Sequence, residues 1–321
     1  MTTSQSEFIQ IFHASEAMLR TELIAGLSAT SATVSPKYFY DALGSKLFAA
    51  ICELPEYYPT RTEAAILQRY QHEIAAAVGV GRTLIDLGAG DCAKAARLFS
   101  TLHPEQYVPV DISVEYLRDA VSQLQQRYPH IKMTGLGMDF SSAIELPNEV
   151  RRSKRLFFYP GSSIGNFTPD EAVAFFKRLS AVCDRDGGLL IGVDLVKDAT
   201  ILNAAYDDAL GVTAAFNLNI LTHLNNKVGA NFDIRGWRHH SFFNAELSRI
   251  EMHLEARHKQ TVSWVGGERC FNAGERIHTE NSYKYTAEGF VGLLQNSGFS
   301  VKKTWRDAEN WFLVCYAGVG V

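Results

Sequence analysis

The stretch TLIDLGAGD, residues 83–91, decides the fold class of this 321-residue chain. Its first three residues form a continuous apolar run, which is typical of a strand buried on both faces in a parallel sheet. Gly88 and Gly90 then allow a sharp turn and a close approach of a ligand to the backbone, because neither carries a Cβ atom. With a helix expected from about residue 93 to 100, the stretch predicts the strand, glycine turn and helix that hold small ligands at the carboxyl end of a sheet.

The glycine turn alone does not separate two classes of cofactor. Residues 88–93, GAGDCA, satisfy the alanine version of the dinucleotide fingerprint, and a plain tight turn would look the same. Asp86 favours S-adenosylmethionine, because a carboxylate there would repel a pyrophosphate but attract a cationic amino group. We therefore expect Asp86, Gly88 and Gly90 to contribute to an S-adenosylmethionine site.

Acidic residues also follow the next two apolar stretches. Asp111 ends the run that begins at Tyr107, where it can accept hydrogen bonds from both hydroxyl groups of a ribose. Asp139 offers a carboxylate to an adenine amino group, and Phe140 offers a ring to lie against the adenine. Each acid alone could equally be a helix cap or a turn residue, so the prediction depends on all three sites together.

Composition and charge exclude several classes of protein. The chain has 46% hydrophobic and 21% charged residues, as soluble globular proteins do, and its formal net charge of −4 provides no basic footprint for nucleic acid. It shows no signal-peptide pattern and no long apolar run, and its five cysteines lack metal spacing. We expect a cytoplasmic monomer with reduced thiols, a small-molecule substrate, and no membrane or nucleic-acid partner.

The ten histidines do not predict a metal site either. His239 and His240 are adjacent, so in a strand they would point to opposite faces of the sheet. No other histidine spacing matches a common metal motif. We expect no metal.

After the glycine turn, predicted helices and strands alternate, which indicates a doubly wound, Rossmann-like α/β sheet. The expected elements are a helix over 114–127, strands over 155–159 and 188–194, a helix over 286–298, and two strands over 299–305 and 311–317. Thr168, Pro169 and Glu171 have the pattern of a helix start with a capping box. The last two strands predict an antiparallel hairpin, which is typical of S-adenosylmethionine methyltransferases and unusual in dinucleotide enzymes.

Two regions lie outside this regular pattern. Residues 1–60 are predicted to be mostly helical, and Thr60 and Glu63 to cap the helix that leads into the sheet. Residues 199–285 form an insertion at the ligand edge of the sheet, where a substrate-selecting region is expected. We therefore expect a methyltransferase domain over 61–198 and 286–321, and a smaller α+β substrate domain over 1–60 and 199–285.

Seven segments, in order from about Pro36 towards the carboxyl terminus, carry a resemblance that includes both irregular regions. They are PKYFYDALGSKLF, LPEYYPTRTEA, GSSIGNFTP, DLVKD, AYDDALGVTAAFN, RIEMHL and IHTENSYKY. Together they resemble the histidine-specific Nα-methyltransferase family of ergothioneine biosynthesis. The resemblance implies the transfer of three methyl groups from S-adenosylmethionine to the α-amino group of free histidine, giving hercynine.

For the cofactor, the resemblance implies Gly88, Asp111, Asp139 and Phe140 again and adds Lys94, which could meet the cofactor's carboxylate. For the substrate it implies a larger set of residues with complementary chemistry. These are Tyr57, Asn166, Tyr206, Glu280 and Ser282, with Tyr40, Gly161, Phe216 and Met252 lining the pocket.

The chemistry of these side chains suits histidine. Asn166 and Tyr206 offer donors to an α-carboxylate, and Tyr40 with the Gly161 loop would orient the amine. Glu280, Ser282 and Tyr57 can bracket an imidazole, whose two nitrogens both need partners when buried. By themselves, however, Tyr57 and Met252 could equally be packed core residues.

The chain departs from the family pattern at Ala89, where a serine is common, and at Asn281, where an apolar residue can occur. Strand alternation predicts that Asn281 points away from the pocket. Three other functions stay open at this point: a methyltransferase for another amino acid such as tryptophan, a non-catalytic S-adenosylmethionine-binding regulator, and an NAD-dependent oxidoreductase.

Overall fold

The computed structural model describes residues 7–11 and 16–320, and the chain divides into two compact units. The first unit contains residues 1–13, 59–196 and 285–321, and the second contains residues 14–58 and 197–284. The prediction that residues 1–60 are mostly helical falls partly outside the described residues.

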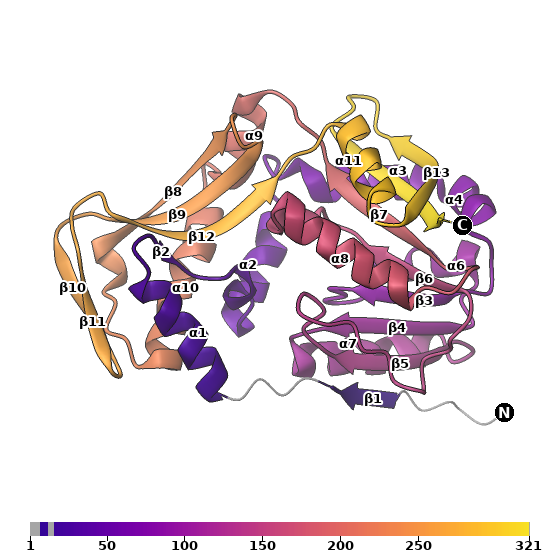
Figure 1. Ribbon diagram of the computed structural model, residues 1–321, viewed down its shortest axis with the longest axis horizontal. Helices are drawn as coiled ribbons and strands as arrows, with labels where there is room; N and C mark the ends of the chain where they lie inside the picture. The colour runs from indigo at the N-terminus through magenta and orange to yellow at the C-terminus, as the bar shows by residue number, and fades with distance from the viewer. Residues whose placement is uncertain (1–6, 12–15, 321) are drawn as a thin grey trace. The chain divides into compact units, whose positions relative to one another are not determined.

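An eight-stranded sheet forms the centre of the first unit (Figure 1). In spatial order its strands are β1 (Glu7–Gln10), β5 (Lys132–Gly137), β4 (Gln106–Asp111), β3 (Thr83–Leu87), β6 (Arg155–Tyr159), β7 (Gly188–Asp194), β14 (Phe312–Val319) and β13 (Phe299–Arg306). The pairs from β1 to β7 are parallel, whereas β14 is antiparallel to both β7 and β13. The predicted Rossmann-like sheet with a terminal antiparallel hairpin is confirmed.

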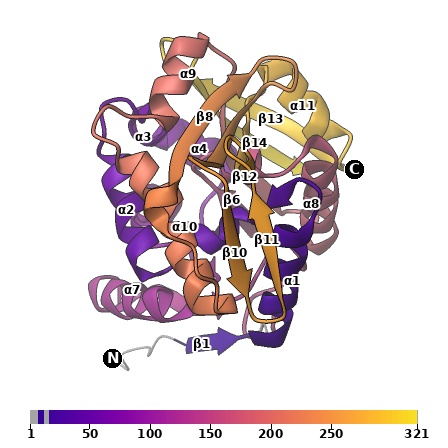
Figure 2. The same cartoon turned by 90° about the vertical axis from the view of Figure 1, so that its left-hand side faces the viewer.

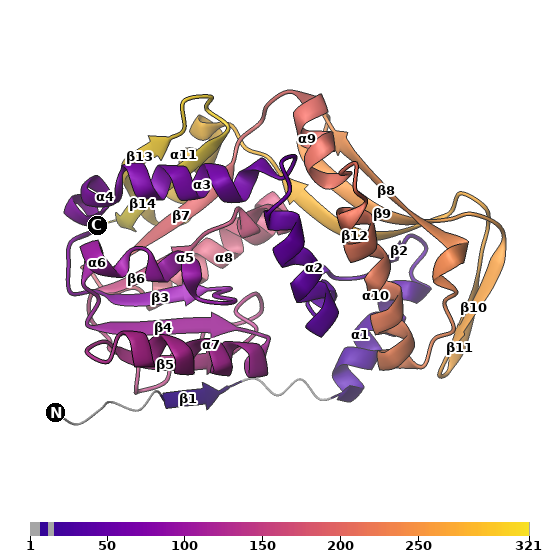
Figure 3. The same cartoon turned by 180° about the vertical axis from the view of Figure 1, so that it is seen from behind.

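Helices cover both faces of this sheet, as a doubly wound fold requires. One face carries α8 (Pro169–Val182) and α11 (Ala287–Gln295), as Figure 1 shows. The other face carries α3 (Tyr58–Arg69), α4 (Gln71–Val78), α6 (Phe99–Leu102) and α7 (Val114–Arg127), seen in Figure 3. Successive side chains of a strand enter different cores: Ile85 packs on the first side and Leu84 on the second.

Two local predictions about helix starts have different outcomes. The capping box is confirmed at α8, where the Thr168 hydroxyl accepts a hydrogen bond from the Glu171 N–H at 3.3 Å and the Glu171 carboxylate accepts one from the Thr168 N–H at 2.8 Å. The predicted cap at Thr60 is wrong, because α3 already begins at Tyr58 and Glu63 bonds elsewhere.

The helix expected over residues 93–100 is shorter than predicted. It consists of α5 (Ala93–Ala96), followed after a turn by α6. At the break, the Leu98 N–H donates to the Ala95 carbonyl three residues back at 2.9 Å, and this tighter bond interrupts the α-helical pattern.

The second unit is an α+β structure. Its four-stranded sheet has the order β2 (Ala32–Thr33), β12 (Arg276–Tyr283), β9 (Arg249–Ala256) and β8 (Trp237–Asn244), and β10 (Gln260–Trp264) with β11 (Gly267–Phe271) forms a separate hairpin (Figure 2). The helices are α1 (Glu16–Ser28), α2 (Ala42–Cys52), α9 (Ala199–Tyr206) and α10 (Val212–Val228), together with the short turn η1 (Pro36–Phe39). Both α9 and α10 pack against β8 and β9 (Figure 3).

A β-bulge in β12 decides which face its side chains occupy. His278 is paired with His253, but Glu280 is paired with the preceding residue of β9, Met252, so Thr279 is an extra residue in the strand. An extra residue shifts the alternation of faces by one position. The His278 ring therefore bonds Asn281 Oδ1 at 2.9 Å on one face, while Glu280 and its partner Met252 lie on the other.

Two whole-chain features complete the fold. Each of the five cysteines is free. Within the described ranges, no helix combines the length and the apolar character needed to span a membrane.

Candidate active site

The glycine turn after β3 exposes backbone at the carboxyl end of the sheet. Gly88 and Gly90 have φ angles of 71° and 52°, in the left-handed region that side chains disfavour. A Cβ atom on Gly90 would meet nothing within 4 Å, and one on Gly88 would lie 3.8 Å from the Phe140 ring. The turn is therefore open to a ligand and has an aromatic ring beside it.

Asp111, at the end of β4, is held against this turn. Its Oδ2 accepts a hydrogen bond from the Gly90 N–H at 3.0 Å, and its Oδ1 accepts one from the Ser113 N–H at 2.9 Å. The half-buried carboxylate is thus fixed at the point where a ribose could reach it.

Asp139 and Phe140 follow β5, the next strand. Asp139 accepts a hydrogen bond from the Ser141 N–H at 3.1 Å, and the Phe140 ring packs edge-on against Tyr159 with 5.7 Å between centroids. Because Phe140 also lies beside Gly88, the structure brings the loops after β3, β4 and β5 together at one edge of the sheet.

Asp86 occupies a different environment from the loop acids. It lies inside β3, only 1% exposed, and one carboxylate oxygen accepts a hydrogen bond from the Tyr107 hydroxyl at 2.7 Å. Burial raises the pKa of Asp86 to about 7, although the Tyr107 hydrogen bond and the Lys94 charge oppose that shift. Among the described residues its Oδ1 has no hydrogen-bond partner, so the hydrogen-bonding capacity of this buried oxygen is not fully used.

Glu63 connects two of the predicted residues, and the sequence did not identify this role. One oxygen of its buried carboxylate accepts from the Gly161 N–H at 2.7 Å, and the other accepts from Lys94 Nζ at 3.0 Å. Gly161 has a φ angle of 78°, in the left-handed region that favours glycine, and Lys94 Nζ would lie 3.0 Å from a Cβ atom there. Glu63 is thus a buried support that places the lysine beside the loop after β6.

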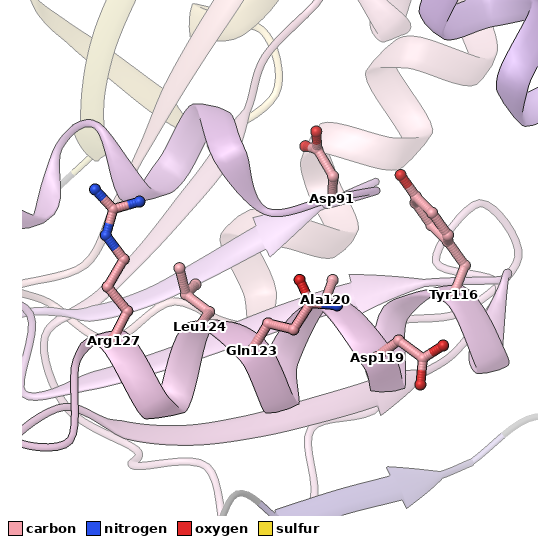
Figure 4. Close-up of a pocket in the computed structure, with 7 residues that line it drawn as sticks. All are labelled: Asp91, Tyr116, Asp119, Ala120, Gln123, Leu124 and Arg127. Atoms are coloured by element: carbon pink, nitrogen blue, oxygen red, sulfur yellow. The ribbon is translucent and has the colours of Figure 1, made fainter.

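A groove of about 470 Å³ with a mixed polar and apolar lining lies along α7, near the glycine turn. Figure 4 shows the helix side chains with Asp91 above them on the loop after β3. The lining residues are Asp91, Tyr116, Asp119, Ala120, Gln123, Leu124 and Arg127. The groove contains none of the predicted cofactor residues, so we do not assign the cofactor to it.

An aromatic cluster occupies the second unit. The Phe216 ring on α10 lies 5.9 Å from both Tyr40 and Phe48, and Tyr57 lies 6.2 Å from Phe48 and 6.0 Å from Tyr206, all measured between ring centroids. Burial raises the pKa of Tyr57 well above its usual value, with the charges of neighbouring groups including Tyr206 and Glu280 adding to the effect. Tyr57 is therefore a neutral hydrogen-bonding group.

A hydroxyl network adjoins this cluster. The Tyr206 and Ser282 hydroxyl groups are 2.8 Å apart, and the buried Lys284 donates to Tyr206 at 3.0 Å and to Ser282 at 2.8 Å. Lys284 lies within a segment that resembles the family, but the sequence does not mark it as a site residue, because an isolated lysine is normally a solvated surface residue.

Glu280 is the acidic group of this region. Burial raises its pKa to about 7, and the positive charge of Lys284 acts in the opposite direction. No residue in the described part of the chain donates a hydrogen bond to its carboxylate. The buried Met252 is its cross-strand partner, so an apolar side chain and a carboxyl group lie next to each other.

The predicted site residues are divided between the two units. The first unit contains all the cofactor residues together with Gly161 and Asn166, the latter in the short turn η2 (Ser163–Asn166). The second unit contains Tyr40, Tyr57, Tyr206, Phe216, Met252, Glu280 and Ser282.

The parallel sheet with a reversed terminal hairpin, and the glycine turn facing an aspartate on the next strand, define the class of S-adenosylmethionine-dependent methyltransferases. The chain belongs to the histidine-specific, S-adenosylmethionine-dependent methyltransferase family, whose model matches residues 19–319. Among its relatives is a histidine N-alpha-methyltransferase of Mycolicibacterium smegmatis, 40% identical over 97% of this chain and 98% of the relative.

Two further relatives extend the comparison. A Mycobacterium tuberculosis protein, also called histidine N-alpha-methyltransferase, is 37% identical over 92% of each chain. Ergothioneine biosynthesis protein 1 of Neurospora crassa is 32% identical over 83% of this chain, but the match covers only 31% of that protein.

Proposed function

We propose that this protein transfers three methyl groups from S-adenosylmethionine to the α-amino group of free L-histidine, giving hercynine for ergothioneine biosynthesis. Family membership and the names of the mycobacterial relatives support histidine as the substrate. The structural observation that carries the proposal is Glu280, a partly buried carboxyl group that no described residue satisfies, next to Tyr57 and Ser282.

In this proposal Glu280 accepts a hydrogen bond from one ring N–H of histidine. Ser282 and Tyr57 provide polar partners for the rest of the imidazole ring. Met252 and Phe216 enclose its apolar edges. These assignments match the chemistry of a neutral heteroaromatic ring, which needs both polar partners and apolar contact when it is buried.

The other end of histidine requires different partners. Asn166 and Tyr206 would donate to the α-carboxylate, and Tyr40 and the Gly161 loop would orient the amine. Because Tyr206 also bonds to Ser282 and Lys284, a single network would connect the carboxylate end with the ring end of the substrate.

For the co-substrate S-adenosylmethionine, we propose that the backbone of Gly88 and Gly90 contacts it and that Asp111 binds its ribose hydroxyl groups. Asp139 and Phe140 would contact the adenine, Lys94 the carboxylate and Asp86 the amino group. The open glycine turn and the orphaned Asp86 oxygen fit such a ligand. Its sulfonium supplies a strongly activated methyl group, so the reaction requires no metal.

In each transfer, the lone pair of the neutral α-amine forms the new N–C bond while the methyl–sulfur bond breaks and its electrons remain on sulfur. The first two products then lose a proton to solvent, whereas the third remains as the quaternary ammonium. The contribution of the protein is mainly positioning, because an in-line attack needs the nitrogen, carbon and sulfur to be aligned. Tyr40 is proposed as a positioning residue rather than as a general base.

Mass spectrometry of the purified protein with S-adenosylmethionine and each of the common amino acids tests the proposal. Histidine is expected to gain the mass of one, two and finally three CH₂ groups, while tryptophan and a histidine-containing peptide remain unmodified. Transfer to tryptophan instead would identify a different substrate, and no transfer to any free amino acid would contradict the proposal.

A further inference from the structure

The face of the β9–β12 sheet opposite Glu280 carries a cluster of two histidines and a carboxylate. Glu251 and His253 come from β9, and His278 comes from β12. Each offers a ligand atom, and these atoms all lie within 4.8 Å of one another. Neither the glycine turn nor the aromatic cluster includes any of the three, so the proposed methyl transfer leaves them without a role.

The spacing of the cluster is close to that of a metal site. The His253 Nε2 and Glu251 Oε2 atoms are 3.1 Å apart, and the His253 and His278 rings have 5.0 Å between centroids. Ligands bonded at about 2.1 Å to a tetrahedral zinc ion are separated by roughly 3.4 Å. Small side-chain rotations therefore suffice to bring the three ligand atoms around one ion.

Burial and hydrogen bonding shift the pKa of each of the three groups. Burial lowers the pKa of His253 to about 4, against the opposing effect of its bond to Glu251, and burial likewise lowers the pKa of His278. Burial acts to raise the pKa of Glu251, but hydrogen bonds from Arg249, His253 and Asn244 outweigh it, so the pKa is lowered.

One of these imidazoles is incompletely satisfied. The buried His253 Nδ1 has no hydrogen-bond partner among residues 7–11 and 16–320. Because the Nε2 atom of the same ring is the one beside Glu251, an ion at Nε2 would leave Nδ1 to carry the ring proton, so Nδ1 is not one of the ligand atoms.

We propose that Glu251, His253 and His278 bind one divalent transition-metal ion, for which Zn²⁺ is the probe, with water completing the coordination. Arg249 is paired with the Glu251 Oε1 atom at 2.7 Å and so leaves Oε2 for the metal. The ion replaces the His253–Glu251 hydrogen bond and competes with the bond between His278 Nε2 and Asn281 Oδ1. The positive charges of Arg249 and Arg276 also limit its affinity.

A bound ion would join β9 to β12 immediately before the bulge at Thr279. The strands it connects carry Met252 and Glu280 on their opposite face. The inferred role is therefore structural, in that it fixes the register of two strands that contribute to the proposed substrate site.

The experiment uses the complete protein with any affinity tag removed, treated with a chelator and dialysed. Calorimetric titration with Zn²⁺ is expected to show one site. His253→Ala and His278→Ala should each weaken binding by at least about tenfold, since even supporting residues around a metal have effects of that size. The matched control is His258→Ala, in the exposed turn after β9, which should bind as the original protein does.

All three residues belong to the second unit, so folding of each variant is checked by circular dichroism and by its thermal unfolding. If an alanine variant does not fold, Glu251→Gln removes the charged ligand while preserving the shape. Co²⁺ absorption provides a second readout that does not depend on catalysis. Absence of saturable binding by the unmodified protein, or equal binding by the His253 and His278 variants, would overturn the metal site and leave the proposed methyl transfer untouched.

Discussion

The carboxyl group of Glu280 ionises in the pH range where the enzyme is expected to act. With a pKa raised to about 7, it is largely protonated at pH 6 and largely ionised at pH 8. Since the ionised form is the stronger acceptor for a ring N–H, histidine recognition should improve as the pH rises through this range.

Glu280→Gln should remove that dependence. The kcat/KM for histidine is expected to fall about tenfold or more above pH 7, because a charge-assisted hydrogen bond worth roughly 1.5 to 3 kcal/mol is lost. The comparison is made between complete pH profiles of the two proteins, since the titration of histidine itself is common to both. Identical profiles would place Glu280 outside the substrate site.

Lys284→Met provides the complementary test of the same carboxyl group. The Lys284 ammonium lowers the pKa of Glu280. Its removal should therefore shift the rise of kcat/KM for histidine to higher pH without abolishing that rise. If the variant has a changed maximum rate but the rise of kcat/KM occurs at the same pH, Lys284 acts only through the Tyr206–Ser282 network.

At the residue scale, the sequence indicates candidate site residues where a local pattern or the likeness to the family marks them. Gly90 and Asp111 lie at the ends of predicted strands, and their meeting at the sheet edge is a consequence of the fold. Glu63 and Lys284 could not be recognised, because their roles depend on burial and on partners far away in the chain, as for the bond between Lys284 and Tyr206.

At the scale of elements, the bulge at Thr279 determines where Glu280 points. Deleting Thr279 removes the bulge and restores regular alternation in β12. The residues on one side of the deletion then change faces of the sheet relative to those on the other side. Histidine turnover is therefore expected to fall by at least about tenfold, the effect of losing a single strong contact, while the first unit still binds S-adenosylhomocysteine.

Thr279→Val is the matched control for this deletion. It keeps the residue count of β12 but removes the hydrogen bonds from the Thr279 hydroxyl to Asn217 Oδ1 and to the Met252 carbonyl. Steady-state kinetics should show a much smaller loss than in the deletion. An equal loss in both would indicate that the hydroxyl, rather than the alternation, is what matters.

The long elements were predictable from periodicity, whereas the short and irregular ones were not. The helix over 114–127 and the strand over 188–194 have the predicted bounds, because each has a clear apolar pattern. The short strands β1 and β2 are recognisable only through their partners β5 and β12, and no residue pattern in β12 indicates its bulge.

At the scale of the whole molecule, the division into two units predicts that cofactor and substrate binding can be perturbed separately. Asp111→Asn should weaken S-adenosylhomocysteine binding about tenfold or more, since the ribose hydroxyl groups lose a charged acceptor. Glu280→Gln should leave that affinity nearly unchanged, because Glu280 belongs to the second unit.

Thermal unfolding with and without S-adenosylhomocysteine measures this difference, since a ligand that binds only the folded protein raises the midpoint. Asp111→Asn should reduce the ligand-induced rise, and Glu280→Gln should retain it. A reduced rise in both variants would contradict a separate cofactor site in the first unit.

The position of β14 has a consequence for the synthesis of the chain. This strand lies between β7 and β13, so the edge of β7 stays without its neighbour until β14 has left the ribosome. Until then the side chains of Leu313 and Val314 are missing from the cores on the two faces of the sheet. The exposed edge of β7 can meanwhile pair with strands of other chains. We therefore expect the nascent chain to be prone to aggregation until β14 has emerged, and a chain truncated before β14 to be less soluble than the longer one.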